Sequence, residues 1–390
     1  MLRLTKERIL WVDSIKAVGM FLVFYDHIAE RVAAAGSAIA FYQLKFDHAF
    51  LMPVFFIISG FFFKPHGNFN DNFKKLFLRR LLPVFVFGLL FIPLWITYFY
   101  MKFGFVDWYQ IIVKILYYLK GSPQLNLITW FLVCLFTCEI LASFIIPKIK
   151  SRTRSLFWGI LILVTGLLVC RYHLSIAKLT GVTLNTWYIH EAIVAMGFYF
   201  TGFSIFPFIK KIAATKKWMV YLLLPIFFFI AFFTFNLNSP TEDFTVLMVL
   251  SQHGYIIPFL ITAFAGAFFL ISLCIILPFN SLFEYIGKNT LYLLGLNGIF
   301  HHFINGEIVD LYAPPDSVVW TSLYCSVIVL LSMLLCAPII TILDKNIPQL
   351  FGKTSKEGPF LPNLEKFKWR DKVREANKIY VKNKLLKKEN

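Results

Sequence analysis

The stretch from Arg8 to His27 is strongly apolar, yet it contains Asp13, Lys16, Asp26 and His27. At about 100° per helical residue, the step from Lys16 to His27 returns the two side chains to within about 20° of each other, and Asp13 lies one turn before Lys16. A helix therefore places Asp13, Lys16 and His27 on one stripe. The same arithmetic turns Asp26 about 140° away from Asp13, so we expect Asp26 to face a different neighbour and leave it out of the site.

This stripe carries residue types that can do chemistry. Ionisable groups at bilayer depth cost about 2.5 to 3.5 kcal/mol each on insertion scales, so they usually face a protein interior or a wet cavity. His27 can accept and return a proton near neutral pH, and Lys16 can bind an anion while Asp13 orients it. At 1.5 Å per residue, Lys16 and His27 lie about 16 Å apart, comparable to an extended pantetheine arm. The structural alternative is an Asp13–Lys16 ion pair near a helix end, with His27 in the outer interface.

Composition sets the protein class. The 390 residues are 58% hydrophobic and 15% charged, which excludes an ordinary soluble enzyme and indicates a polytopic membrane protein. We expect an all-α membrane bundle of about ten transmembrane helices within residues 1–343, followed by a basic cytoplasmic tail at 344–390 that forms an amphipathic helix on the membrane surface. The expected spans are 9–34, 41–63, 81–100, 125–146, 155–171, 187–207, 218–236, 255–277, 289–305 and 318–343.

The basic residues alternate with these spans. Of the 38 lysines and arginines, 30 fall in the N-terminal segment, in alternate loops and in the tail, whereas seven fall in the other loops. By the positive-inside rule, both termini are expected in the cytoplasm. The net charge of +17 is then explained by membrane topology, and no nucleic-acid partner is expected. The six cysteines are scattered in apolar segments and suggest neither a metal site nor a disulfide framework.

Four motifs occur in order between Lys16 and Leu132. They are a basic residue, ten others and a histidine (Lys16 to His27), MPVFFIISGFF at 52–62, the cluster Lys74, Lys75, Arg79 and Arg80 before LLP, and TWFL at 129–132. Together they resemble the acyltransferase-3 family of multi-spanning membrane acyltransferases, most closely the branch containing fucose O-acetylase-like proteins. The sequence departs from that branch at two positions: Leu51 replaces a histidine that often precedes the Met-Pro pair, and Asn297 replaces a late histidine, for which His48 and His301 are spatial substitutes to consider.

The resemblance implies a bacterial inner-membrane O-acyltransferase that moves an acetyl or other short acyl group from cytoplasmic acetyl-CoA. The acceptor would be a hydroxyl of a cell-envelope glycan or lipid-linked sugar, and no metal is expected. His27 would be the general base, supported by Lys16 and Asp13. The implied acyl-CoA-binding residues are Ser59, Gly60, Arg79 and Arg80.

Each of these assignments has an alternative. Ser59 and Gly60 are also typical of helix packing, and Arg79 and Arg80 of cytoplasmic anchoring. A transporter or exporter of lipid-linked or polymeric sugar would use intramembrane charges for coupling, and a membrane sensor or scaffold would tolerate their neutral substitution. Glu139 is expected inside the fourth span, where it must be neutral, paired or in a wet cavity. The other ionisable or polar residues of the spans and loops are expected near the outer interface, where solvated residues are common: His190, Glu191, His253, Asn297, His301 and His302.

Overall fold

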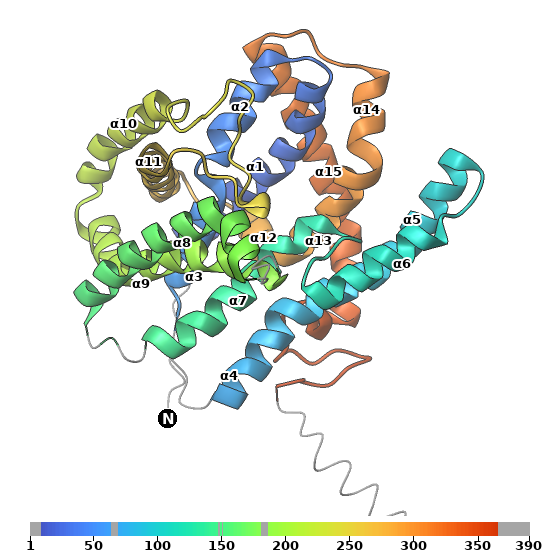
Figure 1. Ribbon diagram of the computed structural model, residues 1–390, viewed down its shortest axis with the longest axis horizontal. Helices are drawn as coiled ribbons and strands as arrows, with labels where there is room; N and C mark the ends of the chain where they lie inside the picture. The colour runs from blue at the N-terminus through green and yellow to red at the C-terminus, as the bar shows by residue number, and fades with distance from the viewer. Residues whose placement is uncertain (1–8, 64–68, 147–148, 150, 181–185, 366–390) are drawn as a thin grey trace, which may run out of the picture.

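The computed structural model describes residues 9–63, 69–146, 149, 151–180 and 186–365. Within these ranges every regular element is helical, and the only β-type pairing is an isolated bridge between Leu247 and Gln252. The all-α prediction is therefore confirmed. The α-helices, arranged as in Figure 1, are α1 (Leu10–Ala34), α2 (Ala38–His48), α3 (Leu51–Gly60), α4 (Phe69–Leu76), α5 (Leu82–Phe103), α6 (Trp108–Leu116), α7 (Trp130–Ile145), α8 (Arg152–Thr180), α9 (Ile189–Thr215), α10 (Lys217–Thr234), α11 (Ile256–Ile276), α12 (Ser281–Lys288), α13 (Thr290–Ile299), α14 (Asn305–Leu311) and α15 (Val318–Asn346).

Seven helical segments of the described chain are long and apolar enough to cross a membrane. They correspond to seven of the ten expected spans, and the count of ten stays a prediction. These segments are Phe69–Phe103, Leu127–Ile145, Arg152–His173, Thr186–Thr215, Lys217–Thr234, Ile256–Ile276 and Val318–Asn346.

The other three expected spans differ from a simple apolar helix for identifiable reasons. The span at 41–63 is divided between α2 and α3; Pro53, which has no amide hydrogen to donate, lies in the first turn of α3, where a proline is well tolerated. The span at 289–305 consists of α13, the π-helix Phe300–Ile304 and the start of α14, and it contains two histidines and three asparagines. α1 is long enough, but it carries Asp13, Lys16, Asp26, Glu30 and Arg31.

α1 is the helix around which the others are arranged. It contacts α2, α3, α11, α12, α13, α14 and α15, and most of its side chains are buried. Figure 1 shows α1 among these helices, with α5 and α6 extending from the bundle at the right. Because protein surrounds α1, its charged side chains have polar partners and a cavity to face rather than lipid.

The segment after residue 344 begins as part of the folded bundle. The 3-10 turn Pro348–Phe351 buries Phe351, whose ring packs against the rings of Phe87 and Tyr292. Lys353 donates a 2.6 Å hydrogen bond to Asp344. The described part of the expected tail is thus anchored against α5, α13 and α15, whereas the basic amphipathic stretch expected beyond residue 365 lies outside the described residues.

Candidate active site

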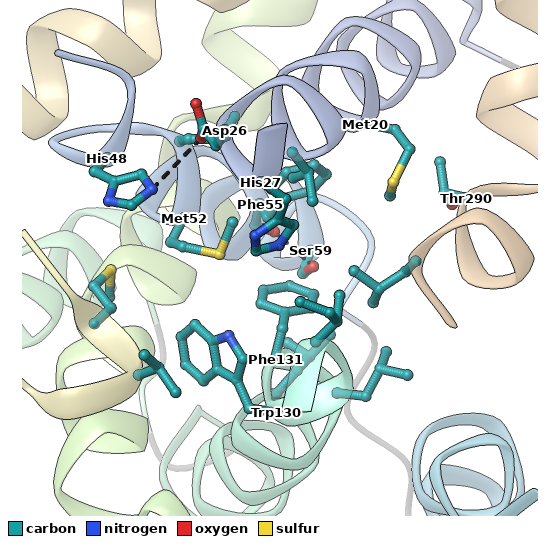
Figure 2. A pocket seen from close by; sticks show the side chains of 18 of the residues that line it. Met20, Asp26, His27, His48, Met52, Phe55, Ser59, Trp130, Phe131 and Thr290 are labelled. Carbon is teal, nitrogen blue, oxygen red and sulfur yellow. Dashed lines mark hydrogen bonds and ion pairs between the residues drawn. The ribbon is translucent and has the colours of Figure 1, made fainter. Parts of the chain in front are cut away.

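A cavity of about 430 Å³ lies beside α1. α1 forms one wall, and much of the remaining lining is aromatic or aliphatic; Figure 2 shows Trp130 and Phe131 across the cavity from His27. The residues that line it are Lys16, Met20, Val23, Asp26, His27, Glu30, His48, Leu51, Met52, Phe55, Ile58, Ser59, Phe62, Arg80, Leu127, Ile128, Trp130, Phe131, Leu132, Leu135, Val246, Leu247, Met248, Val249, Thr290, Leu291, Leu294 and His301.

The structure brings Lys16 and His27 to the same cavity. Together with Met20 and Val23 they lie on one face of α1, with the helical spacing used above. Asp13 is buried one turn below and lies 3.9 Å from the Lys16 ammonium, so it contacts Lys16 without lining the cavity. The stripe read from the sequence therefore faces a space that can hold a small molecule.

Asp26, which we left out of the predicted site, lines the same cavity. Asp26 does face a different neighbour, because its Oδ2 lies 3.8 Å from Nε2 of His48 at the end of α2. Both side chains nevertheless line the cavity, as Figure 2 shows. Asp26 projects from a different side of α1 than Lys16 and His27, and the cavity extends to that side beside His48 at the end of α2. The Asp26 Oδ1 atom is buried and has no hydrogen-bond partner in the described chain.

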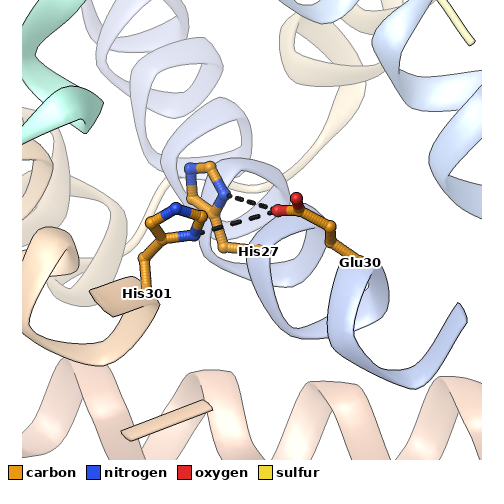
Figure 3. A group of neighbouring side chains, drawn as sticks. All are labelled: His27, Glu30 and His301. Atoms are coloured by element: carbon orange, nitrogen blue, oxygen red, sulfur yellow. Dashed lines mark ion pairs between the residues drawn. The ribbon is translucent and has the colours of Figure 1, made fainter. Parts of the chain in front are cut away.

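Glu30 joins the two histidines nearest the C-terminal part of α1. Its Oε2 lies 3.7 Å from Nδ1 of His27 and 3.8 Å from Nδ1 of His301, and the two imidazole centroids are 4.5 Å apart (Figure 3). The sequence reasoning missed Glu30, although its spacing of three residues from His27 was a usable signal. Both histidines considered as substitutes, His48 and His301, line the cavity, and His301 contacts His27. Asn297 is buried and does not line the cavity.

Two π-helices carry site residues. Phe77–Leu81 contains Arg80, and Phe300–Ile304 contains His301. An extra residue in a helical turn shifts the direction of the side chains that follow, and such turns often occur at functional sites. Neither π-helix was predicted, since a hydrophobic pattern does not reveal a one-residue insertion in the hydrogen-bond ladder.

Arg80 lies at the cavity and is fixed by Glu139. Its Nε and Nη2 donate 2.9 Å hydrogen bonds to the two oxygens of the Glu139 carboxylate, which is the paired state expected for an acid at this depth. The Nη1 donors have no partner among the described residues. A guanidinium held in this way has a fixed orientation and donors left for an anion.

Arg79 points elsewhere. It does not line the cavity, and its guanidinium donates to Glu365 at 2.6 Å. Burial alone would raise the pKa of the Glu365 carboxyl, but hydrogen bonds from Thr354 and Arg79 outweigh it and lower that pKa below its usual value. Two adjacent arginines that the sequence could not distinguish thus have different partners.

Ser59 and Gly60 also separate. Ser59 lines the cavity, and its hydroxyl donates a 2.7 Å hydrogen bond to the Phe55 carbonyl. Gly60 does not line the cavity; a Cβ there would overlap the Tyr199 carbonyl oxygen of α9. The structure therefore favours helix packing as the role of Gly60.

A second polar cluster is buried between α8, α9 and the 246–254 loop. Glu191 is fully buried. Its carboxylate accepts a 3.0 Å hydrogen bond from the Ser251 hydroxyl and lies 3.2 Å from Nε2 of His253 and 3.8 Å from Sγ of Cys170. His190 is also buried. The expectation of solvated positions for His190, Glu191 and His253 was wrong. This cluster holds the loop whose residues 246–249 form part of the cavity wall.

Two groups of described residues have the side-chain types of a metal site. In each, the ligand atoms lie within 4.8 Å of one another. One is His27, Glu30 and His301, and the other is Cys170, Glu191 and His253. In the first group a divalent ion would compete with the proton for the histidine nitrogens, because both need the same lone pairs.

The fold and the cavity define a helical, multi-spanning membrane protein with a cavity in which a histidine, a lysine and an arginine lie beside apolar walls. The acyltransferase domain model of the acyltransferase-3 family matches residues 9–337. The chain belongs to this family, which makes it a membrane acyltransferase. Comparisons with curated proteins and with solved structures gave no match.

Proposed function

We propose that the protein is an O-acyltransferase that moves an acetyl or other short acyl group from acyl-CoA to a hydroxyl of a cell-envelope carbohydrate. The observation that carries this proposal is that His27 and Lys16 line one cavity in a chain of the acyltransferase-3 family. A volume of about 430 Å³ lies in the range of small-molecule pockets.

In this proposal His27 is the general base. Glu30 orients the imidazole through Nδ1, which leaves Nε2 to take the proton from the acceptor hydroxyl. The hydroxyl oxygen attacks the thioester carbonyl carbon, the carbon–sulfur bond breaks, and the coenzyme A thiolate takes the proton back from the imidazolium. His301 shares Glu30 with His27, and the centroids of the two imidazole rings are 4.5 Å apart.

The donor is proposed to occupy the Lys16 end of the cavity. Lys16, Ser59 and Arg80 place two cations and a hydroxyl there, suited to phosphate and thioester oxygens. The apolar wall formed by Phe55, Trp130 and neighbouring residues suits the pantetheine arm. The donor roles predicted for Gly60 and Arg79 are left out of the proposal, because neither residue lines the cavity.

Lys16→Ala is expected to raise the apparent KM for acetyl-CoA about tenfold to a hundredfold, because a hydrogen bond to a charged group contributes about 1.5 to 3 kcal/mol. Lys16→Arg should keep part of the affinity, since either cation can face a phosphate. The assay measures transfer of labelled acetyl from acetyl-CoA to an envelope glycan fraction in membranes, at matched protein abundance.

Lys288→Ala is the matched control, because Lys288 forms an exposed ion pair with Glu284 and does not line the cavity. An unchanged KM in Lys16→Ala would remove Lys16 from the donor site.

The donor is proposed to enter from the cytoplasm, with both termini on that side of a bacterial inner membrane. The basic asymmetry supports this orientation. Single cysteines placed at residues 5 and 390 should react with a membrane-impermeant maleimide only after the membrane is opened, whereas a cysteine at residue 104 should react in intact cells. A residue 390 that is labelled in intact cells would contradict the orientation.

A further inference from the structure

A second cavity, of about 290 Å³, lies on the other side of His301. It is formed by the C-terminal ends of α1 and α5 and by α14, and His301 lines both this cavity and the first one. Its lining residues are Arg31, Ala34, Ala35, Tyr98, Lys102, His301, His302, Phe303, Gly306, Glu307, Val309 and Asp310.

The two cavities differ in chemistry. The first is walled mainly by aliphatic and aromatic side chains, whereas the second presents two cations, two carboxylates and two imidazoles around one tyrosine ring. Donors and acceptors gathered in one small space match the alternating hydrogen-bonding capacity of a polyhydroxylated ring, and an aromatic face suits its C–H face. The pair Lys102–Glu307, at 3.2 Å, keeps a donor and an acceptor side by side.

The wall between the cavities is the histidine cluster itself. Arg31 Nη2 donates a 3.3 Å hydrogen bond to the His301 carbonyl, and Nε2 of His302 accepts a 3.3 Å hydrogen bond from the Leu127 amide. These two hydrogen bonds fix the π-helix to α1 and to the segment before α7. The Nδ1 atom of His301 is buried, makes no hydrogen bond to a described residue and lies 3.8 Å from the Glu30 carboxylate. A group in the second cavity therefore meets His301, with His27 directly behind it.

We propose that the second cavity is the acceptor site and that it binds a hydroxylated carbohydrate ring. This inference rests on the proposed function and adds the place from which the acceptor arrives: it approaches the His27–Glu30–His301 cluster from the side opposite the Lys16 end. The acceptor oxygen gives its proton to an imidazole of the cluster and forms the ester bond as the carbon–sulfur bond of the donor breaks, with the proton passing to the thiolate.

Gly306 provides the sharpest test. It lines the second cavity, and a Cβ there would meet no heavy atom within 4 Å. Gly306→Trp should fill the cavity and lower acetyl transfer to the envelope glycan fraction about tenfold or more at limiting glycan, while the acetyl-CoA affinity changes less than about twofold. Leu311→Trp is the matched control and should transfer at the wild-type rate, because Leu311 lies on the same helix, is exposed and lines neither cavity.

Glu307→Gln is a second variant that avoids bulk. Loss of one hydrogen-bond acceptor should raise the glycan requirement about threefold to tenfold, with no change in the acetyl-CoA requirement. Glu284→Gln is its control, because Glu284 also pairs with a lysine on an exposed surface but lines neither cavity.

The outcomes separate the two proposals. A wild-type protein that binds no acetyl-CoA and transfers no acetyl would overturn the proposed function, and this inference with it. A wild-type protein that transfers acetyl, with Gly306→Trp and Glu307→Gln showing unchanged glycan dependence, would overturn the acceptor site alone. Equal loss of donor binding in Gly306→Trp would assign the second cavity to the donor instead.

Discussion

His27→Ala should lower acyl transfer by about 10² to 10⁴-fold, the usual contribution of a positioned general base. Insertion, abundance and acetyl-CoA binding should stay close to wild type. His27 is the one member of the α1 stripe that can both accept and return a proton near neutral pH. It lines the cavity beside Glu30, whereas Lys16 lies toward the opposite end of the stripe.

The measurement is labelled acetyl transfer to the envelope glycan fraction, with donor binding and variant abundance determined on the same membranes. His173→Ala is a matched histidine control, since His173 is on α8, its Nδ1 lies 2.7 Å from the Cys170 carbonyl, and it lines neither cavity. Near-normal transfer by His27→Ala would end the assignment of a catalytic histidine. A sugar transporter or exporter would then be the leading hypothesis for the charged cavity.

Helical periodicity was sufficient to locate the wall of the cavity that α1 provides. Lys16 and His27 share a face of one continuous helix, so their relation depends only on rise and twist, which the sequence supplies. Glu30 follows the same rule and could have been included. The surroundings of Asp26 could not be predicted in this way, because they depend on His48, and helical periodicity does not say where α2 places that residue.

Residues whose roles depend on a partner helix could not be assigned from the sequence. Gly60 belongs to a family motif, yet it allows close approach of the α9 backbone at Tyr199. Arg79 and Arg80 are neighbours in the π-helix, but Arg79 pairs with Glu365 and Arg80 with Glu139, so their side chains point in different directions. These distinctions come from tertiary contacts.

Interruptions of the helices limited the span assignments in the same way. Pro53 marks the start of α3 and was visible in the sequence, so the break at 41–63 had a signal. The π-helix that carries His301 had none, because a hydrophobic pattern does not reveal a one-residue insertion in the hydrogen-bond ladder. Both interruptions border the cavity, where backbone distortions are often retained for function.

The last prediction concerns the Arg80–Glu139 pair, in which removal of one partner should be worse than removal of both. Glu139→Leu leaves the guanidinium without its carboxylate, and Arg80→Met leaves a largely buried carboxylate alone; each is expected to cost about 3 to 5 kcal/mol of stability. The double variant Arg80→Met/Glu139→Leu should recover most of that loss, because two apolar side chains of similar size replace the pair.

Stability is measured as the fraction of solubilised protein that stays monodisperse on heating, and the acetyl-CoA KM is measured beside it. The recovered double variant should still bind acetyl-CoA poorly, since it lacks the Nη1 donors proposed to face the donor phosphates or thioester. Arg79→Met/Glu365→Leu is the matched control: that pair is partly exposed, so its removal should change stability by about 0 to 1 kcal/mol. A double variant with wild-type donor affinity would show that Arg80 serves the fold alone, and one as unstable as either single variant would show that packing, rather than an unpaired charge, sets the cost.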